Sequence, residues 1–468
     1  MITINTYNDL IELGDNERER EQFILDAINV HKGSADYRTA EDATAYYNHE
    51  NPTIMRYQKF VYNRFGQKVP NTWSANNKIA SNWYYYFTSQ AVQYLLGNGV
   101  SFKEESTKEK LGKDFDYQVQ KAATEAKNGA VSFGFWNYDH LEVFALTEFV
   151  PFYDEEDGGL KAGIRFWQID SGKPLRATLY ELDGYTDYIK RTDEDITILH
   201  KKRAYKTTIT RTEADGEIIL DGQNYEGFPI VPLWNVNKKS DIVGNQGTID
   251  AYDLMMSGLI NNATDGEFLY WILTNCDGMS DDEVIEFIEG LALNHVAKAG
   301  HGEDGSHVDA HRAEVPFAAN AEALNRLRDQ LFQDFMALRV EHIGAGATND
   351  QIQAAYEPIN QKTDQFEYQV TQFIMGILKL AGIDDKPTYS RSQMSNRSET
   401  LGNILQSAEY LDSEYITKKI LTLLGDADIV DEVLQRKLDE ETARFQAQAQ
   451  QTAVLSQIEA NAKAGVEE

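Results

Sequence analysis

The stretch EHIGAGATNDQIQ, Glu341–Gln353, separates two segments that have strong helical periodicity. Apolar side chains recur at three- and four-residue spacings on both sides of it: Leu324, Leu327, Leu331, Phe335 and Leu338 before it, and Phe366, Val370, Phe373, Ile374 and Ile377 after it. The pattern predicts one helix over Ala321–Arg339 and a second helix that ends at Ala381. A tight turn needs fewer residues than this stretch has, and a buried core segment needs bulkier ones. The stretch is therefore either an ordinary flexible connector or a loop whose small side chains serve a purpose.

The composition is that of a large folded protein. Its 468 residues, of which 42% are hydrophobic and 11% aromatic, are too many for one simple core, so we expect several subdomains. The single cysteine, Cys276, excludes an intramolecular disulfide and zinc sites built from several cysteines, and it favours an intracellular setting. The N-terminus has no apolar signal core, and no segment has the apolar length that a bilayer needs. We therefore expect neither secretion by that route nor a membrane span.

The formal charge is strongly negative, −31 at pH 7, with 75 Asp and Glu against 44 Lys and Arg. Such a balance argues against ordinary nucleic-acid binding, because contacts to phosphates need Lys and Arg. The charge is compatible with simple solubility. It is also compatible with a surface that stays close to nucleic acid without adhering to it.

The N-terminal part shows helical patterns separated by polar residues. A helix is expected over Asn16–Asn29, with Phe23, Ile24 and Ala27 facing inward. Residues 31–54 are polar and rich in tyrosine, which predicts a connector.

The next helical pattern begins at Asn76 or Asn77, either of which can cap a helix, and it carries the block Trp83–Phe87. Such a block is either helical core or a stacking platform for bases. A platform needs basic neighbours, and in the sequence Lys78 alone is close. We therefore interpret the block as helical core.

The pattern of apolar and polar residues changes twice further along the chain. From about residue 130 to Val236, apolar and polar residues alternate between Asp-Gly and Gly-Gly turns, which predicts a mostly antiparallel sheet with hairpins. A helix follows from near Gly247 to Asp265. The C-terminal part is helical and increasingly polar, and beyond Arg444 we expect a frayed or an accessory helix. Its expected N-caps and helix stop are Ser398, Asp412 and Gly425.

No common nucleotide-binding or catalytic motif occurs in the sequence: GxxxxGK[ST], GxGxxG after a strand, GxSxG and HExxH are all absent. Carboxylates are so numerous that pairs arise by chance, and we expect no catalytic residue. Histidine and acidic residues, which are good metal ligands, gather around His295, His301, His307 and His311. Their spacing matches no helix face and three glycines lie among them. A surface loop that meets a partner is therefore favoured over a metal site, and no cofactor is expected.

The order of the parts along the chain is more specific than any single motif. NNKI…YLLGN is followed by a sheet-rich region that ends in FPIVPLWN and then by a helix that carries IDAYDLMMSGLINNATD. A short strand–helix–strand insert, a long helix, the glycine-rich loop and a helical C-terminal part come next. This order resembles that of the portal proteins of tailed bacteriophages, in the branch found in long-tailed phages of Gram-positive hosts. The resemblance covers roughly residues 17–442.

The resemblance implies an α+β fold, mainly helical, with the wing, stem, clip and crown of phage portal proteins. The implied parts are residues 1–236 (wing, N-terminal helices plus the antiparallel sheet region), 237–266 (first stem helix), 267–320 (clip), 321–341 (second stem helix), 342–351 (tunnel loop), 352–387 (spine helix of the wing), 388–444 (crown) and 445–468 (polar C-terminal tail). The family pattern does not account for the tail.

The resemblance also implies a function without covalent chemistry. Portal proteins form homo-oligomeric rings, usually dodecamers, around a channel at one capsid vertex through which double-stranded DNA is packaged and ejected. They assemble in the host cytoplasm with scaffold and major capsid protein, dock the packaging ATPase (terminase), and later hold head-completion (adaptor) proteins and the tail. The implied location is the portal vertex of the virion, with no membrane. The alternatives are another virion head protein and a metal-dependent enzyme of unrecognised type.

The same resemblance gives the small-residue loop a place in the channel lumen, where bulky side chains would collide with neighbouring copies or with DNA. Glycine also permits the backbone changes of a mobile loop. The implied loop residues are His342, Gly344, Ala345, Gly346, Ala347, Thr348 and Asn349.

The acidic composition then has a role as well. Asp and Glu are expected to line much of the channel, because Lys–phosphate pairs would anchor the DNA. Weak contacts to DNA are assigned to Arg326, Arg328 and Arg339 on the second stem helix. The histidine-rich segment, with His295, His301, His307 and His311, is assigned to the surface of the clip that faces partner proteins.

Overall fold

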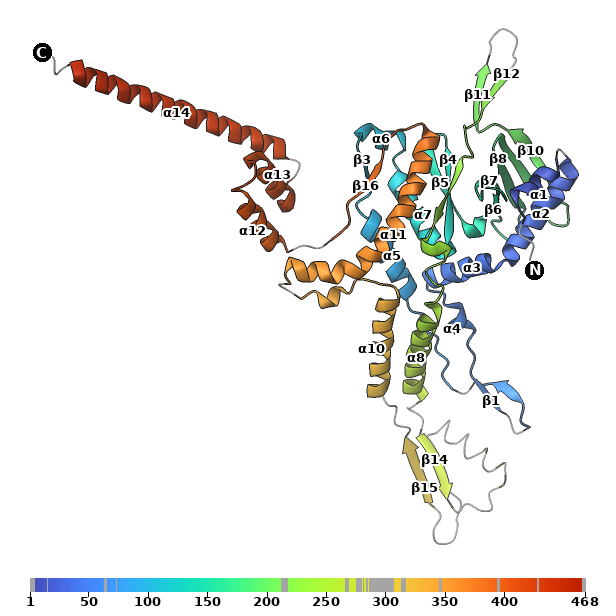
Figure 1. Cartoon of the computed structure of the whole chain (residues 1–468). Helices are drawn as coiled ribbons and strands as arrows, with labels where there is room; N and C mark the ends of the chain where they lie inside the picture. Colours follow the sequence, from blue (N-terminus) through green and yellow to red (C-terminus); the bar gives the residue numbers. More distant parts are fainter. Residues whose placement is uncertain are drawn as a thin grey trace. The chain divides into compact units, whose positions relative to one another are not determined.

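Two antiparallel sheets occupy the middle of the chain in the computed structural model (Figure 1). Their strands are β4 (Val131–Asn137), β5 (His140–Ala145), β6 (Phe149–Tyr153), β7 (Leu160–Trp167), β8 (Leu175–Glu181), β9 (Gly184–Lys190), β10 (Thr197–Arg203) and β13 (Ile230–Trp234). The larger sheet has the order β10-β9-β8-β7-β6 and the smaller one the order β13-β4-β5, and all neighbours are antiparallel. The short 3-10 helix η1 (Leu146–Glu148) leads from β5 into β6. The antiparallel sheet region predicted from the alternating pattern is confirmed.

The structure describes residues 5–14, 16–62, 65–72, 74–211, 218–265, 269–274, 280, 282, 285, 307–312, 317–344, 347–393, 396–426 and 429–464. The chain divides into two compact units, one made of Met1–Leu338 and Pro358–Ser392 and the other of Arg339–Glu357 and Gln393–Glu468. Helices and strands are mixed in the first unit, and the second unit is helical in its described part. The mixture of helices and strands confirms the predicted α+β class.

The N-terminal region contains four helices, α1 (Tyr7–Glu12), α2 (Glu17–Gly33), α3 (Ala35–Tyr47) and α4 (Pro52–Arg56). The predicted helix over Asn16–Asn29 is confirmed as α2, with Asn16 as its N-cap and Ile24 and Ala27 buried. The prediction of a polar connector over residues 31–54 is wrong, because α3 and α4 lie there.

The buried face of α3 explains this error. Tyr37, Ala40, Ala43 and Tyr46 are buried at three-residue spacing, and the Ser34 hydroxyl accepts the hydrogen bond that caps the helix. Small alanines and amphipathic tyrosines give a weak hydrophobic signal although their spacing is helical. The face therefore reads as polar in the sequence.

Three more helices and the short strand that follows the first of them lie between α4 and the sheets. They are α5 (Trp83–Leu96), α6 (Glu105–Lys110), α7 (Phe115–Gly129) and β3 (Val100–Phe102), which pairs with β16 (Pro387–Tyr389). The helix α5 begins at Trp83 with Asn82 as its N-cap, so the expected start at Asn76 or Asn77 is wrong. Tyr84 and Phe87 are buried in the core, whereas Tyr85 and Tyr86 are partly exposed. The aromatic block is therefore helical core on one face.

Three further antiparallel strand pairs in the described part of the chain form two-stranded sheets of their own. They are β1 (Phe60–Tyr62) with β2 (Lys68–Pro70), β11 (Lys206–Arg211) with β12 (Ile218–Gln223), and β14 (Leu269–Thr274) with β15 (His307–Arg312). The last pair gives the two strands of the expected strand–helix–strand insert.

The short 3-10 helix η2 (Val236–Lys238) leads to α8 (Gln246–Asp265), which confirms the helix expected from near Gly247. The helix α10 (Phe317–Asp334) ends five residues before the predicted end at Arg339. Met336 adopts a left-handed conformation with φ of 50°, and the Ala337 amide donates to the Phe332 carbonyl at 3.0 Å. This is a Schellman motif with methionine where glycine is usual, so the sequence gives no obvious stop signal.

The helix α11 (Asn349–Ala381) ends where the sequence predicts, and it contains Pro358 at the boundary between the two units. Its C-terminal half packs against the smaller sheet through a buried stripe of Phe366, Val370, Phe373, Ile374, Ile377 and Leu378. Gly134 of β4 has no side chain because a Cβ atom there would lie 2.5 Å from the Phe373 ring. The glycine lets helix and sheet approach closely.

The described part of the second unit also contains η3 (Val340–His342), α12 (Arg397–Ser407), α13 (Ser413–Leu424) and α14 (Val430–Ala464). Asp412 caps α13 and Gly425 ends it with φ of 96°, as predicted. The expected cap at Ser398 is wrong, because Asn396 caps α12. The helix α14 passes through Arg444 without a break and ends at Ala464, so the residues just beyond Arg444 are helical and not frayed. No helix in the described part of the chain combines the length and apolarity that crossing a membrane requires.

Candidate functional site

The helices α8 and α10 lie side by side and run antiparallel (Figure 1). The Thr248 hydroxyl at the start of α8 donates to the Asp334 carboxylate at the end of α10, at 3.1 Å. At this end, Phe332 and Phe335 pack on the aromatic face of α5, and the Phe87 and Phe335 rings stack with centroids 4.6 Å apart. Aromatic packing therefore anchors one end of the helix pair in the core of the first unit.

A polar stripe on α8 fixes the extended segment before α5. Asp253, Ser257 and Asn261 follow each other at four-residue spacing, and all three are buried. Their side chains accept hydrogen bonds from the amides of Ser81 (3.0 Å), Ile79 (3.0 Å) and Asn77 (2.7 Å), respectively. The helix thus satisfies alternate amides of the segment much as a neighbouring strand would. These bonds explain why residues 77–81 do not begin the helix α5.

Apolar side chains on α8 are incompletely covered within the chain. Ile249 is buried, whereas Leu254 and Ile260 are 42% and 40% exposed. Exposed apolar side chains of this kind can add to a contact with a partner where other apolar residues complete the surface.

The three arginines assigned to DNA have different surroundings. Arg326 is well exposed on α10 and forms an ion pair with Glu322 one turn earlier, at 2.9 Å. Arg328 is half-buried on the same helix. Arg339 is also half-buried but lies beyond the end of α10, so its expected place on that helix is wrong.

The small-residue loop is described on both sides of its centre. His342 belongs to η3, and a Cβ atom built on Gly344 would have no heavy atom within 4 Å. The Ala347 amide donates to the Gly344 carbonyl at 3.0 Å. Ala345 and Gly346 lie outside the described residues. Gly344 is not in the left-handed region, so the local backbone does not require glycine there.

The C-terminal end of the loop is held by two sets of hydrogen bonds. Thr348 and Gln351 form a reciprocal pair at the start of α11: each side chain accepts from the other's amide, at 3.2 and 3.3 Å. This is the geometry of a capping box. The Asn396 amide donates to the Asn349 side chain at 2.8 Å, and the Asn396 side chain donates to the Ala347 carbonyl at 3.1 Å.

The same contact extends into α12. The Asn349 amide donates to Glu399 at 2.8 Å, and the Asn349 side-chain amide donates to Thr400 at 3.2 Å. Asn396 also caps α12 by accepting from the Glu399 amide at 3.3 Å. One set of side chains thus joins the end of the loop to the first turn of α12, within the second unit.

The structure describes two of the four histidines that the sequence assigned to the clip. His307 and His311 lie on β15, paired with Thr274 and Tyr270 of β14. His295 and His301 lie outside the described residues. No three His, Cys, Asp or Glu side chains gather as metal ligands in the part of the chain that the structure describes.

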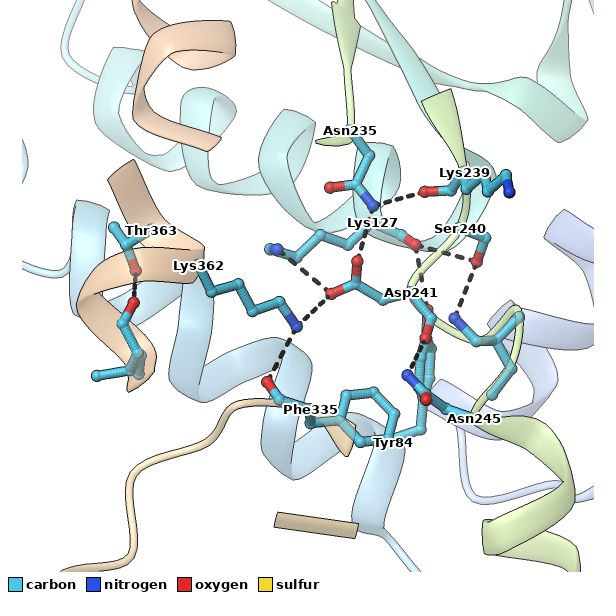
Figure 2. Close-up of polar contacts among 12 residues, drawn as sticks. Tyr84, Lys127, Asn235, Lys239, Ser240, Asp241, Asn245, Phe335, Lys362 and Thr363 are labelled. Carbon is cyan, nitrogen blue, oxygen red and sulfur yellow. Dashed lines mark hydrogen bonds and ion pairs between the residues drawn. The ribbon is translucent and has the colours of Figure 1, made fainter. Parts of the chain in front are cut away.

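Sequence reasoning missed a buried charge cluster in the first unit (Figure 2). Asp241, in the turn before α8, lies between two lysines, with its Oδ2 atom 3.4 Å from Lys127 Nζ and 3.0 Å from Lys362 Nζ. Asn235 donates to the other carboxylate oxygen at 2.8 Å. Lys127 is 1% exposed and its ammonium group lies 4.3 Å from the centre of the Phe366 ring.

The cluster connects α7, the turn before α8, and α11. Burial lowers the pKa of Lys127, against the attraction of Asp241. Burial also acts to raise the pKa of Asp241, but the two ammonium groups outweigh it and hold this pKa far below its usual range. The Lys127 carbonyl accepts from Tyr84, Ser240 and the Asp241 amide, which also holds the end of α7 in place. One signal was present in the sequence: Lys127 falls one turn after Ala123 on the buried face of α7.

Comparison with known proteins gives the chain its family. The sequence matches the family described as phage portal protein, SPP1 Gp6-like, over residues 28–453. The portal protein of Bacillus phage SPP1 is 24% identical over 398 residues, which cover 77% of this chain and 76% of that protein. The portal protein of Clostridium phage phiCD119 is 24% identical over 408 residues, which cover 80% of this chain and 87% of that protein. The match includes both sheets, α8, α10 and α11, and the resemblance inferred from the order of motifs is confirmed. This chain therefore belongs to the SPP1 Gp6-like family of phage portal proteins.

Proposed function

We propose that this chain assembles into a closed ring at one vertex of a phage capsid, and that double-stranded DNA enters and leaves the head through its channel. The family match over residues 28–453 carries the proposal. Identical subunits close into a ring through head-to-tail contacts between two different faces. The exposed apolar residues Leu254 and Ile260 on α8 support such a contact. We propose a dodecamer as the state of the ring.

In this ring the parts keep the roles that the resemblance implies. Residues 1–236 form the wing, 237–266 and 321–341 the stem, 267–320 the clip, 342–351 the tunnel loop, 352–387 the spine helix, 388–444 the crown and 445–468 the tail. The pairing of α8 with α10 and the two-stranded sheet of β14 and β15 support the assignment of stem and clip.

The tunnel loop faces the lumen in this proposal. The open space around Gly344 supports it, because neither packing against the described residues nor the local backbone explains why this position lacks a side chain. The loop residues proposed to line the channel remain His342, Gly344, Ala345, Gly346, Ala347, Thr348 and Asn349.

The channel surface is predominantly acidic. The net charge of −31 per subunit, summed over a ring, gives a strongly negative field that keeps DNA from adhering to the wall. Arg326 is the best placed of the three arginines for a weak phosphate contact, since it is well exposed. Arg328 and Arg339 are half-buried and would contribute less.

The partners are proposed from the family role. The clip, with His295, His301, His307 and His311, faces the terminase during packaging and the head-completion proteins afterwards. Scaffold and major capsid protein surround the ring when it is built into the head, in the host cytoplasm. The chain itself performs no covalent chemistry and needs no cofactor, because ATP hydrolysis belongs to the terminase.

Electron microscopy of the negatively stained purified protein, together with light scattering, tests the proposal. The expected particle is a closed ring with a central opening, and its mass should be that of about twelve subunits. A monomer, or a particle without an opening, would overturn it. A metal-dependent enzyme predicts stoichiometric metal in the purified protein. Another virion head protein predicts incorporation at many capsid sites and not at one vertex.

A further inference from the structure

The sequence contains one long stretch without any acidic residue. No Asp or Glu occurs in residues 51–103, although 75 of the 468 residues are acidic. The stretch carries six basic residues: Arg56, Lys59, Arg64, Lys68, Lys78 and Lys103. The remaining chain then has 38 Lys and Arg against the same 75 Asp and Glu, so its net charge is −37. A cationic segment is thus attached to a strongly anionic protein.

The most exposed part of this stretch is the hairpin of β1 and β2. We call residues 57–62 and 65–72 the arm. The arm exposes large aromatic side chains, with Tyr57 at 44%, Phe60 at 48%, Tyr62 at 76% and Phe65 at 72% exposure. Its two strands pair with each other and with no further strand in the described part of the chain. An isolated two-stranded hairpin is marginally stable in water, and clustered exposed aromatic residues mark interaction sites.

The base of the arm is held firmly. The Asn71 amide donates to the Lys59 carbonyl at 2.9 Å, and the Lys59 ammonium donates to the Ala75 carbonyl at 2.8 Å. Before the arm, Asn51 caps α4 and donates to Asp253 of α8 at 2.7 Å. After it, residues 77–81 are bonded to the polar stripe of α8. The arm is therefore presented from a fixed base, as a preorganised contact element would be.

We propose that the arm docks on the acidic surface of a neighbouring copy of this chain and helps to close the ring, an inference that rests on the proposed function. Charge selects this occupant, because a second copy offers a surface of opposite sign to the arm. The exposed aromatic side chains supply the apolar contact that such an interface needs at its centre.

Double-stranded DNA fits the same arm less well. A duplex exposes mainly phosphates and sugars, and its few apolar groups lie inside the grooves, so it offers little apolar surface to Tyr62 and Phe65. The Lys68 ammonium lies 4.2 Å from the centre of the Phe60 ring, where it stiffens the hairpin and flanks its apolar face. A protein surface with acidic side chains around an apolar patch matches both features.

Photo-crosslinking tests the contact directly. The full-length protein is prepared with p-benzoylphenylalanine in place of Tyr62, and the control carries it in place of Tyr138, which is 68% exposed in the turn after β4. Irradiation is expected to give covalent dimers from the Tyr62 protein and few from the control. Mass spectrometry should place the crosslinks beside Asp or Glu residues of the second copy. Equal dimer yields from both positions would overturn the proposal.

Assembly of arm variants provides the second measurement. Phe60→Ser combined with Tyr62→Ser should raise the concentration at the midpoint of assembly about tenfold or more, since two central aromatic contacts are lost. Lys68→Glu should do the same without removing apolar surface. The matched controls are Tyr117→Ser combined with Tyr138→Ser, and Lys173→Glu, all at exposed positions. Circular dichroism and the melting temperature verify that each variant is folded.

The outcomes separate this inference from the proposed function. Wild-type rings together with arm variants that remain monomeric support both. Arm variants that form rings as readily as the wild type overturn the arm contact and leave the ring intact. If those variants instead lose binding to a fluorescent 30-base-pair duplex, measured by anisotropy, the arm contacts DNA and the proposal is overturned. A monomeric wild type overturns both.

Discussion

The ammonium group of Lys127 lies 3.4 Å from the carboxylate of Asp241, and the two side chains are only 2% and 12% exposed. The second ammonium group, from Lys362, approaches the same carboxylate oxygen to 3.0 Å (Figure 2). Three segments far apart in the sequence thus meet at one carboxylate. Such a cluster adds little stability over an apolar equivalent, but the loss of one member leaves a buried charge without compensation.

Asp241→Asn should therefore destabilise the first unit by about 3–5 kcal/mol, the usual cost of breaking a buried ion pair. Urea unfolding followed by tryptophan fluorescence measures the change. The control is Glu322→Gln, which removes the exposed partner of Arg326 and should change the free energy of unfolding by less than about 0.5 kcal/mol. Equal effects of the two substitutions would show that the cluster is not a structural ion pair.

A second carboxylate predicts a pH dependence. The Thr107 hydroxyl donates to Asp385 at 2.7 Å, and the amides of Lys103, Glu104 and Lys386 also donate to it. These hydrogen bonds, that of Thr107 foremost, lower the pKa of Asp385 to about 2. The unfolded chain binds this proton at about pH 3.9. The unfolded state therefore holds more protons between these values, and the stabilisation is complete above pH 4 and is lost as the pH falls toward 2.

Asp385→Asn should accordingly destabilise the protein most above pH 4. The difference from the wild type should shrink steadily between pH 4 and pH 2. Unfolding curves across this range measure it, and carbon NMR of the side-chain carboxyl group gives the pKa itself. A difference that stays constant with pH would contradict the assignment.

The sequence could predict elements whose signals are local. The alternating strands, the helix α8, the end of α11 and the caps at Asp412 and Gly425 depend on periodicity or on one capping residue, and all are found. The end of α10 depends on Met336 in a left-handed conformation. A methionine in the sequence gives no indication of that conformation. The helix α3 buries alanine and tyrosine, which look polar in a pattern of strong hydrophobes.

Contacts between distant residues were beyond such reasoning. Nothing near Lys127 or Asp241 in the sequence indicates that these residues, 114 positions apart, form a pair. The sequence likewise gives no sign that Asn349 and Asn396 form a pair that joins the end of the loop to α12. The channel role of the loop and of the arginines stays a prediction, because it depends on neighbouring copies and not on the fold of one chain.

Gly344→Trp tests the lumen position of the loop. No described atom lies within 4 Å of a Cβ atom built on Gly344, so a larger side chain meets no obstacle at its root and the melting temperature should stay within about 2 °C of the wild type. Assembly of the oligomeric ring should also persist. Packaging should fall, because the indole side chain of every copy obstructs the channel. Nuclease-protected DNA in a packaging assay measures the effect. Gly172→Trp, at an exposed turn with the same open space, is the control and should package normally.

Packaging at the wild-type level by Gly344→Trp would place the loop away from the DNA path. Gly346→Trp is expected to behave in the same way as Gly344→Trp. Its position lies outside the described residues, so this expectation comes from the sequence alone.

Asn396→Ala tests the link between the loop and α12. The substitution removes the cap of α12 and the bond to the Ala347 carbonyl, so it should cost about 1–2 kcal/mol locally. Hydrogen exchange should then accelerate together in residues 347–352 and in the first turn of α12. Asp412→Ala removes a cap of the same kind from α13, where the Asp412 side chain accepts from the Glu414 and Tyr415 amides. This control should accelerate exchange in α13 alone, and acceleration of the loop in both variants would refute a specific link.

Asn261→Ala tests how α8 holds the segment that leads from the arm to α5. The buried Asn261 side chain accepts from the Asn77 amide at 2.7 Å and donates to the Asn77 carbonyl at 3.1 Å. Truncation removes both hydrogen bonds, which should cost about 2 kcal/mol. The neighbouring Asn262 is exposed on the same helix. Asn262→Ala gains the same helix propensity of about 0.6 kcal/mol without losing these bonds, so the difference between the two variants isolates them.

Urea unfolding of the two variants gives that difference, and limited proteolysis locates it. Asn261→Ala should be cut faster within residues 74–82 than either the wild type or Asn262→Ala, because side-chain bonds hold this segment to α8 and no strand in the described part of the chain includes it. If the arm needs a fixed base to dock, the same variant should also assemble less readily at equal concentration. Unchanged cleavage together with unchanged stability would mean that the polar stripe on α8 is not what fixes the segment.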